Sequence, residues 1–309
     1  MIHNLQHSLK GRRHLPAALL FFIFAGLAAA VSQAAQQPPE TPLGAPARAT
    51  AAVAPAPYEL RVELVRPGLQ KVILAARLEK NGGLIHRPVS WRVRTYDPLT
   101  ARAGRLVHES SQPRAEVALP AGDYQLDIRY GYRHVRQRVR LRSGQYLYMT
   151  FILDVGGLRA LPVVAEMGPL RQVRAVQRLY ALDGRGRGRL VATWSQPGRI
   201  LRLAAGSYRI VSRYLPGNAR TESRVTVKPG ILSSLKITAQ AGMVHIRPGD
   251  GPSRWILRDA ARTWRHSGTG EASLVLAPGQ YVLETGKEPG RRFTIGAGKR
   301  REIVLAGSQ

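Results

Sequence analysis

The chain has 309 residues, of which 44% are hydrophobic, so it has room for two or three globular domains and is not wholly disordered. It carries 47 lysine and arginine residues against 19 aspartate and glutamate residues, a formal net charge of +28. Such a field attracts polyanions of any kind, although an arginine-rich composition also produces it without a partner. The chain contains no cysteine, which excludes disulfide bonds, thiolate zinc sites and a cysteine nucleophile.

The first 34 residues have the three-part pattern of a secretory signal peptide. Basic residues precede an apolar run over residues 15–31, and small residues follow at a cleavage position before Ala35. The apolar run is at the short edge of what spans a bilayer, so an uncleaved anchor in the inner membrane stays an alternative. In both cases we expect the rest of the chain to be exported, to the periplasm or the cell surface.

Residues 35–57 are rich in alanine and proline and carry almost no charge. This composition is typical of an extended spacer with little apolar surface to bury. From Tyr58 onward, short apolar runs broken by glycine, proline and asparagine predict β-strands and turns.

One short motif occurs three times: leucine, two residues that are alanine or proline, glycine, any residue and tyrosine. Each copy separates two runs of alternating apolar residues. The glycine allows the positive φ that a tight turn between strands often requires. The tyrosine is expected to form a tyrosine corner, in which the hydroxyl bonds the backbone just upstream. The glycines are Gly122, Gly206 and Gly279, and the tyrosines are Tyr124, Tyr208 and Tyr281.

Sliding the sequence by 84 residues aligns the first copy of the motif and its flanks with the second. Tyr96 falls on Tyr180, and the Ser-Gln-Pro of residues 111–113 falls on that of residues 195–197. Farther along the offset grows by two, which predicts a longer hairpin at residues 215–218. A repeat of this length is near the size of a small sandwich domain. We therefore expect three β-sandwich domains, over residues 58–154, residues 155–239 and the shorter residues 240–309.

Two tryptophans are candidates for the central core position of these sandwiches. Trp91 and Trp255 are expected to fill it in the first and third domains. The 84-residue shift puts Ala175 there in the second domain, which predicts a looser or differently filled core. Residues 170–182 have apolar residues at helical spacing, but their match to a strand of the first domain favours a strand.

This succession of strand, motif, strand and a last strand after V-x-(V/I)-x-x-G resembles the transthyretin-like or carboxypeptidase-regulatory-like sandwich repeats. It is also similar to the PEGA-type repeats of bacterial envelope proteins. The resemblance covers residues 58–306 and implies an all-β fold of tandem immunoglobulin-like or transthyretin-like sandwiches. Such repeats usually act as spacers or binding modules and carry no catalytic residues, so the resemblance implies that the protein is not an enzyme.

The strongest charged feature is the segment over residues 133–142, in which every second residue from Arg136 onward is arginine. Read as a strand, it places these arginines on one outer face, opposite a single aspartate, Asp127. One interpretation is a binding stripe for an anionic polymer, with Tyr130 and Tyr132 as stacking partners. The other is a solvated face that discourages edge-to-edge strand pairing. The candidate anion-binding residues are Arg129, Arg133, Arg136, Arg138, Arg140 and Arg142.

No motif for hydrolysis, metal binding or nucleotide binding is present, and we expect no catalytic residue, metal or cofactor. The five histidines of the folded part are expected at the surface. The glycine-rich segment over residues 296–299 is interpreted as a turn, and residues 183–189 as a cationic turn or a phosphate or RNA contact. The sequence favours an envelope scaffold or adaptor that binds an envelope protein, an anionic polymer or lipid headgroups. The alternative is a polyanion-binding or nucleic-acid-binding protein, and the export signal counts against nucleic acid.

Overall fold

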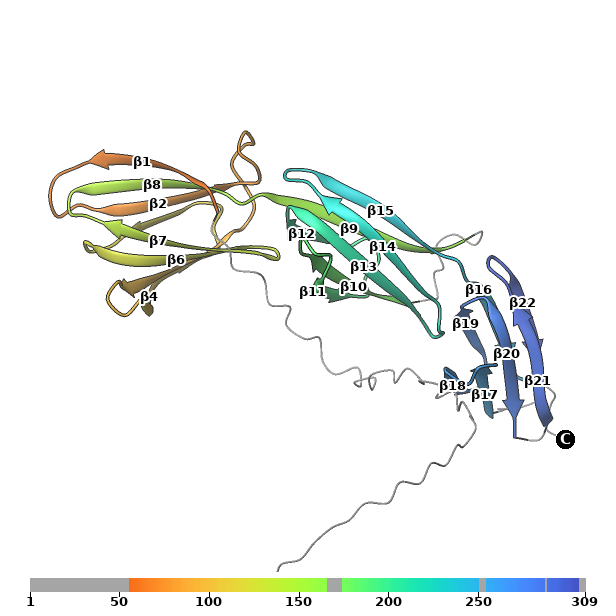
Figure 1. Ribbon diagram of the computed structural model, residues 1–309. Helices are drawn as coiled ribbons and strands as arrows, with labels where there is room; N and C mark the ends of the chain where they lie inside the picture. The colour runs from red at the N-terminus through yellow and green to blue at the C-terminus, as the bar shows by residue number, and fades with distance from the viewer. Residues whose placement is uncertain (1–55, 166–173, 250–253, 287, 306–309) are drawn as a thin grey trace, which may run out of the picture. The chain divides into compact units, whose positions relative to one another are not determined.

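The structure is a computed structural model that describes residues 56–165, 174–249, 254–286 and 288–305. Every element assigned in these ranges is a β-strand, and the strands form six sheets that make three tandem sandwiches (Figure 1). The predicted all-β fold of tandem sandwich domains is confirmed. The signal segment and nearly all of the predicted spacer lie outside the described residues. Among the described residues, no helix has the length and apolar character needed to cross a membrane.

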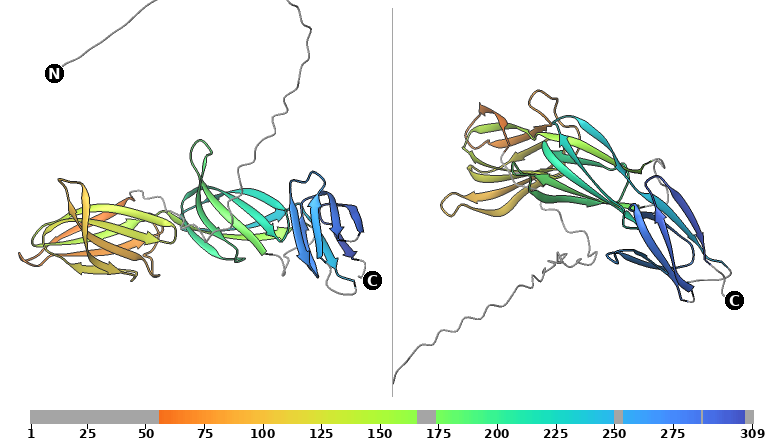
Figure 2. Two further views of the ribbon diagram at one scale, coloured as in Figure 1. Left: turned by 90° about the horizontal axis from the view of Figure 1, so that it is seen from below. Right: turned by 45° about the vertical axis from the view of Figure 1, so that its right-hand side comes forward.

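Domain 1, comprising β1 to β8, has one sheet of order β4-β3-β6-β7 and one of order β1-β8-β2-β5 (Figures 1 and 2). All neighbours are antiparallel except β2 and β8, which are parallel. The strands are β1 (Tyr58–Leu64), β2 (Lys71–Arg77), β3 (Ser90–Asp97), β4 (Arg102–Ser110), β5 (Ala115–Ala118), β6 (Gly122–Tyr130), β7 (Arg133–Leu141) and β8 (Gln145–Ile152).

Over residues 155–165, 174–249, 254–286 and 288–305, domains 2 and 3 repeat this plan without a counterpart of β1. Domain 2 has sheets β11-β10-β13-β14 and β12-β9-β15, and domain 3 has sheets β18-β17-β20-β21 and β19-β16-β22. In each, the first and last strands pair in parallel, as β2 and β8 do. The strands of domain 2 are β9 (Val155–Val164), β10 (Arg174–Leu182), β11 (Gly188–Trp194), β12 (Ile200–Ala204), β13 (Gly206–Leu215), β14 (Arg220–Val227) and β15 (Leu232–Ala239). Those of domain 3 are β16 (Gly242–Arg247), β17 (Arg254–Asp259), β18 (Arg265–Thr269), β19 (Ala272–Leu276), β20 (Gly279–Thr285), β21 (Glu288–Ile295) and β22 (Arg300–Val304).

The three motif tyrosines lie at equivalent places, at the start of β6, β13 and β20. Their hydroxyls donate hydrogen bonds of 2.7–2.8 Å to the carbonyl oxygen four residues upstream, and their rings are buried. Burial raises the pKa of all three tyrosines. Gly206 and Gly279 have φ values of +150° and +159°, but Gly122 has no positive φ. The expectation of a positive φ is therefore wrong for Gly122, which pairs with Leu141 as an ordinary first residue of β6.

The core tryptophans show where the 84-residue alignment fails. Trp91 pairs across the sheet with the fourth residue after its corner tyrosine, and so does Trp255. By the same register the equivalent residue of domain 2 is Gln177, not Ala175. An indole still fills that core, but it is Trp194 of β11, the cross-strand neighbour of Gln177. The reason is that β10 pairs with β13 in a register displaced by two residues from the 84-residue alignment, since Tyr124 pairs with Thr95 but Tyr208 pairs with Ala181.

The longer hairpin of domain 2 contacts the corner motif of domain 3. Asn218 donates from Nδ2 to the Tyr281 hydroxyl at 3.0 Å and accepts from the Ala277 backbone N–H at 2.9 Å. Backbone hydrogen bonds also join Pro216 and Ala219 to Val275. The turn between β6 and β7 makes a comparable contact with domain 2, because the Tyr132 backbone N–H donates to the Arg202 carbonyl at 2.8 Å.

Candidate anion-binding face

The alternation of β7 determines which of its side chains face solvent. Val135 and Leu141 are buried in the core, while Arg136, Arg138 and Arg140 are exposed on the outer face of sheet β4-β3-β6-β7. Arg142 follows the strand and is exposed as well. We call this outer surface the arginine face of domain 1.

Arg133 does not belong to this face. It lies an even number of residues before Val135 and therefore points the same way, toward the interior. Its side chain is half-buried, and its Nε donates to the Leu153 carbonyl at 3.1 Å. The structure places this predicted anion-binding residue toward the interior instead of on the outer face.

Strand register extends the arginine face across all four strands of the sheet. Glu109 of β4, Arg92 of β3, Asp127 of β6 and Arg136 of β7 stand side by side in one row. Arg92 binds Glu109 at 2.7 Å, and Arg136 Nε donates to Asp127 Oδ1 at 2.9 Å. Acidic and basic side chains alternate along this row, so Asp127 separates its two arginines and removes the cross-strand repulsion expected of an all-arginine surface.

The neighbouring rows supply partners that the sequence did not indicate. Arg140 binds Asp123 through two hydrogen bonds, of 2.8 and 3.1 Å, so Asp127 is not the lone acid facing β7. The Arg138 guanidinium lies 4.4 Å from the centre of the Tyr96 ring, a cation–π contact. The expected stacking partners Tyr130 and Tyr132 lie elsewhere, since Tyr130 is buried and Tyr132 packs against the core of domain 2.

Four guanidiniums of the face have no carboxylate partner among the described residues: Arg94, Arg129, Arg138 and Arg142. A hollow of about 170 Å³ opens beside two of them. Its size suits a single phosphate, sulfate or carboxylate group, for which guanidinium groups are the preferred charged donors. The hollow is lined by Ser90, Arg92, Arg94, Asp127, Arg129, His134 and Arg136.

Two titratable groups in the hollow set its charge. His134 is buried, contrary to the expected surface position, and its Nε2 lies 3.3 Å from Asp127 Oδ1. Burial and the nearby Arg129 lower the pKa of His134, although Asp127 acts in the opposite direction. Burial opposes ionisation of Asp127, but hydrogen bonds from Arg136 and Gln125 outweigh it and lower the pKa of that carboxyl. At neutral pH the histidine is neutral and the aspartate charged, so arginine alone supplies the positive charge.

The equivalent face of domain 2 is also basic, which the sequence reading underestimated. On this face Glu222 of β14 lies 3.3 Å from Arg209 and 3.6 Å from Arg220. The signal that could have revealed it is the outward position of residues on paired strands, since these arginines are scattered along the chain. The arginines are Arg174, Arg178, Arg209, Arg213, Arg220 and Arg224.

Other candidates from the sequence have local structural roles. In the 183–189 loop, Asp183 accepts hydrogen bonds from the backbone of Arg185 and Arg187, and residues 296–299 form the turn between β21 and β22. Among the described residues, no group of three histidine, aspartate or glutamate side chains is placed to hold a metal ion.

No protein-family model matches the chain, and no curated protein matches it significantly. Several solved structures match the chain at low sequence identity and low TM-score. The Bacillus anthracis TIE protein is 14% identical over 77% of this chain, with a TM-score of 0.25, and this chain spans half of its length. GBS52, the minor pilin of the gram-positive pathogen Streptococcus agalactiae, is 14% identical over 55% of this chain and 95% of its own, with a TM-score of 0.32. The shaft pilin SpaA from Lactobacillus rhamnosus GG is 13% identical over 55% of this chain and 97% of its own, with a TM-score of 0.28. With scores this low, these likenesses carry no conclusion about function, which rests on the residues of the chain itself.

Proposed function

We propose that the protein is a non-catalytic, exported scaffold whose arginine face binds an anionic polymer of the cell envelope. The observation that carries the proposal is the group of guanidiniums with no carboxylate partner among the described residues, two of which line a hollow of the size of one anionic group. The ion pairs of the neighbouring arginines fix the geometry of the surface, while these guanidiniums attract the anion.

The scaffold part of the proposal is supported by the tandem plan of the fold. The sandwiches repeat one topology with the same tyrosine corner, as in the transthyretin-like and PEGA-type repeats that the sequence resembles. Export is supported by the signal-peptide pattern of residues 1–34. An extracytoplasmic location favours an envelope polymer over nucleic acid as the partner.

The test is a salt titration of binding to two probes, inorganic polyphosphate and the uronic-acid polysaccharide alginate. The full-length protein is compared with a triple variant, Arg94→Ser, Arg129→Ser and Arg138→Ser. We expect the affinity of the variant to fall and the slope of log K against log salt to shrink by roughly 2 to 3, about one for each lost contact.

A control variant removes the same charge away from the sheet face, with Arg87→Ser, Arg199→Ser and Arg300→Ser, all at exposed positions. If both triple variants lose the same affinity, binding reflects the overall field and the site is refuted. If single-stranded DNA binds much more tightly than either probe at the same salt, the nucleic-acid alternative replaces the envelope polymer.

A further inference from the structure

Strand β1 differs from every other strand of domain 1. All seven of its residues are exposed, and the described residues of domains 2 and 3 contain no equivalent strand. It forms the edge of sheet β1-β8-β2-β5, where β8 is its one neighbour in the part of the chain that the structure describes. Its apolar side chains are largely exposed to solvent, with exposed fractions of 80% for Leu64, 51% for Leu60 and 46% for Val62. An apolar edge strand of this length is a template for pairing with another strand.

The free edge of β1 offers a regular row of backbone groups. Val65 donates to the Gly144 carbonyl, and Ile152 donates to the Pro57 carbonyl, so the odd-numbered residues of β1 use their backbone groups toward β8. The N–H and C=O groups of Leu60, Val62 and Leu64 therefore point away from β8. Among the described residues, these groups have no backbone partner.

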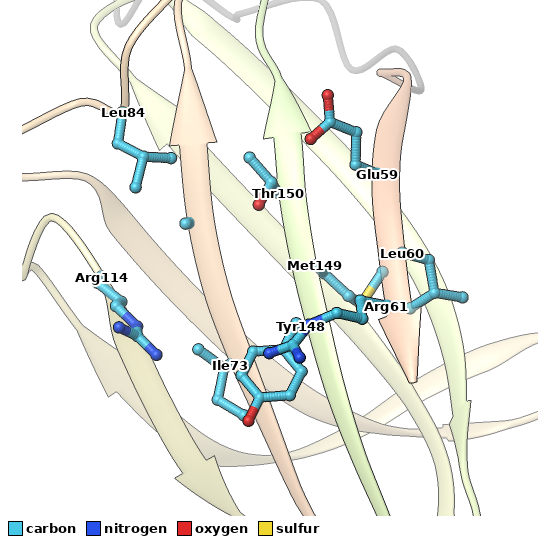
Figure 3. Close-up of a pocket in the computed structure, with 10 residues that line it drawn as sticks. Glu59, Leu60, Arg61, Ile73, Leu84, Arg114, Tyr148, Met149 and Thr150 are labelled. Carbon is cyan, nitrogen blue, oxygen red and sulfur yellow. The ribbon is translucent and has the colours of Figure 1, made fainter. Parts of the chain in front are cut away.

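Side chains on β1 alternate in a way that complements a second copy of itself. Leu60, Val62 and Leu64 lie on one face, and Glu59, Arg61 and Glu63 on the other. Arg61 reaches over the ring of Tyr148, with 3.8 Å between guanidinium and ring centre (Figure 3), and the Tyr148 hydroxyl donates to Glu63 at 2.9 Å. Tyr148 thus holds both charged side chains at the strand surface, and Arg61 also lines a hollow of about 450 Å³.

We propose that β1 pairs antiparallel with β1 of a second copy, centred on Val62. This register places Val62 opposite the Val62 of the second copy, Leu60 opposite Leu64, and Arg61 opposite Glu63, each of the last two twice by symmetry. The leucine and valine pairs are hydrogen-bonded through the free edge, and the Arg–Glu pairs fall at the closer non-hydrogen-bonded positions. The product is a continuous eight-stranded sheet across a two-fold axis, the commonest symmetry of protein dimers.

A second copy suits this edge better than an unrelated extended peptide because the charges match in both directions. If the two-fold axis passed through Leu60 instead of Val62, Glu63 and Leu64 would have no β1 residue of the second copy opposite them. Strand β7, one of the two edge strands of the opposite sheet in domain 1, carries the exposed arginines described above and would repel a like strand.

The test uses two charge variants of the full-length protein, Arg61→Glu and Glu63→Arg, with sedimentation velocity up to about 0.5 mM because small interfaces are weak. The wild type is expected to dimerise. Each variant alone places like charges opposite each other twice and should weaken dimerisation about tenfold or more. An equimolar mixture restores both charge pairs and should recover the wild-type dimer fraction, which the register centred on Leu60 would not do.

A second variant tests the backbone pairing. Val62→Pro removes an N–H that β8 does not use, and proline is tolerated on edge strands at such positions. It should abolish the dimer while circular dichroism stays unchanged. A monomeric wild type, or a dimer that survives both single charge variants and Val62→Pro, would overturn the proposal. Because none of these changes touches the arginine face, polyphosphate binding should be the same in every variant.

Discussion

Domains 1 and 2 follow one strand plan but differ in the core and in the charged face that the plan positions. At the same register position domain 1 has Trp91, with none of its surface exposed, and domain 2 has Gln177, with 2% exposed. On the neighbouring strand the larger side chain is in domain 2, since the small Ser110 pairs with Trp91 and the large Trp194 pairs with Gln177. The topology therefore needs one indole at this level of the sandwich but does not specify the strand that supplies it.

Because the tryptophan lies on β11 instead of β10, the described core of domain 2 has more polar groups without hydrogen bonds than the core of domain 1. Trp91 donates from Nε1 to the Gln112 carbonyl at 2.8 Å, whereas Trp194 Nε1 has no hydrogen-bond partner among the described residues. The same holds for the side-chain amide of Gln177 and the hydroxyl of Ser212, which are cross-strand neighbours. Buried polar groups without partners lower stability, so the core of domain 2 is expected to be the weaker of the two.

The largest expected effect follows from removing the indole of domain 1. Trp91→Ala should reduce the free energy of unfolding of domain 1 by about 3–5 kcal/mol, because a fully buried indole and its hydrogen bond are lost. Hydrogen exchange followed by mass spectrometry reports each domain separately, and the loss should appear in domain 1 peptides. Unchanged protection there would show that Trp91 is not central to the core.

The opposite sign is expected at the equivalent position of domain 2. Gln177→Met keeps a similar volume and replaces an amide that lacks partners, so it should raise the stability of domain 2 by about 1 kcal/mol. Urea unfolding followed through exchange of domain 2 peptides measures the change. A loss of stability would mean that the amide is satisfied in solution, and the comparison of the two cores would fail.

The sequence predicts the fold class well and the details of register poorly. Alternating runs and the Gly-x-Tyr motif are local patterns, and they suffice for the strands and the corner tyrosines. The shift of β10 by two residues becomes visible only in its pairing with β13, and identical tyrosines at positions 96 and 180 hide it. The alternating arginines of β7 could be read from one strand, but Arg92, Arg94 and Asp123 join them only through strand pairing, which a single segment cannot show.

The arginine face of domain 1 and the equivalent basic face of domain 2 can be compared by removing an acid from the first. Asp123→Asn releases Arg140 from its carboxylate partner and makes this part of domain 1 resemble domain 2, which has Ser207 at the equivalent position. If the face binds polyanions, affinity for polyphosphate should rise severalfold at low salt, and the gain should disappear at high salt. Isothermal titration at two salt concentrations measures it. An unchanged affinity would restrict binding to the hollow around Arg129.

The smallest effect is a pH dependence confined to domains that contain a buried histidine. Burial lowers the pKa of His134 in the folded state, so between this value and the unfolded value near 6.5 the unfolded chain binds more protons. The contribution of His134 to stability is therefore fully present above the unfolded pKa and is lost as pH falls through that window.

Domain 2 has no histidine, with Arg220 at the position equivalent to His134, and serves as the internal control. Exchange protection, corrected for intrinsic rates, should decline between pH 7.5 and 5.5 in domain 1 and not in domain 2, and His134→Gln should remove the decline. An equal decline in both domains would assign the effect to the net charge of the whole protein instead of to the buried imidazole.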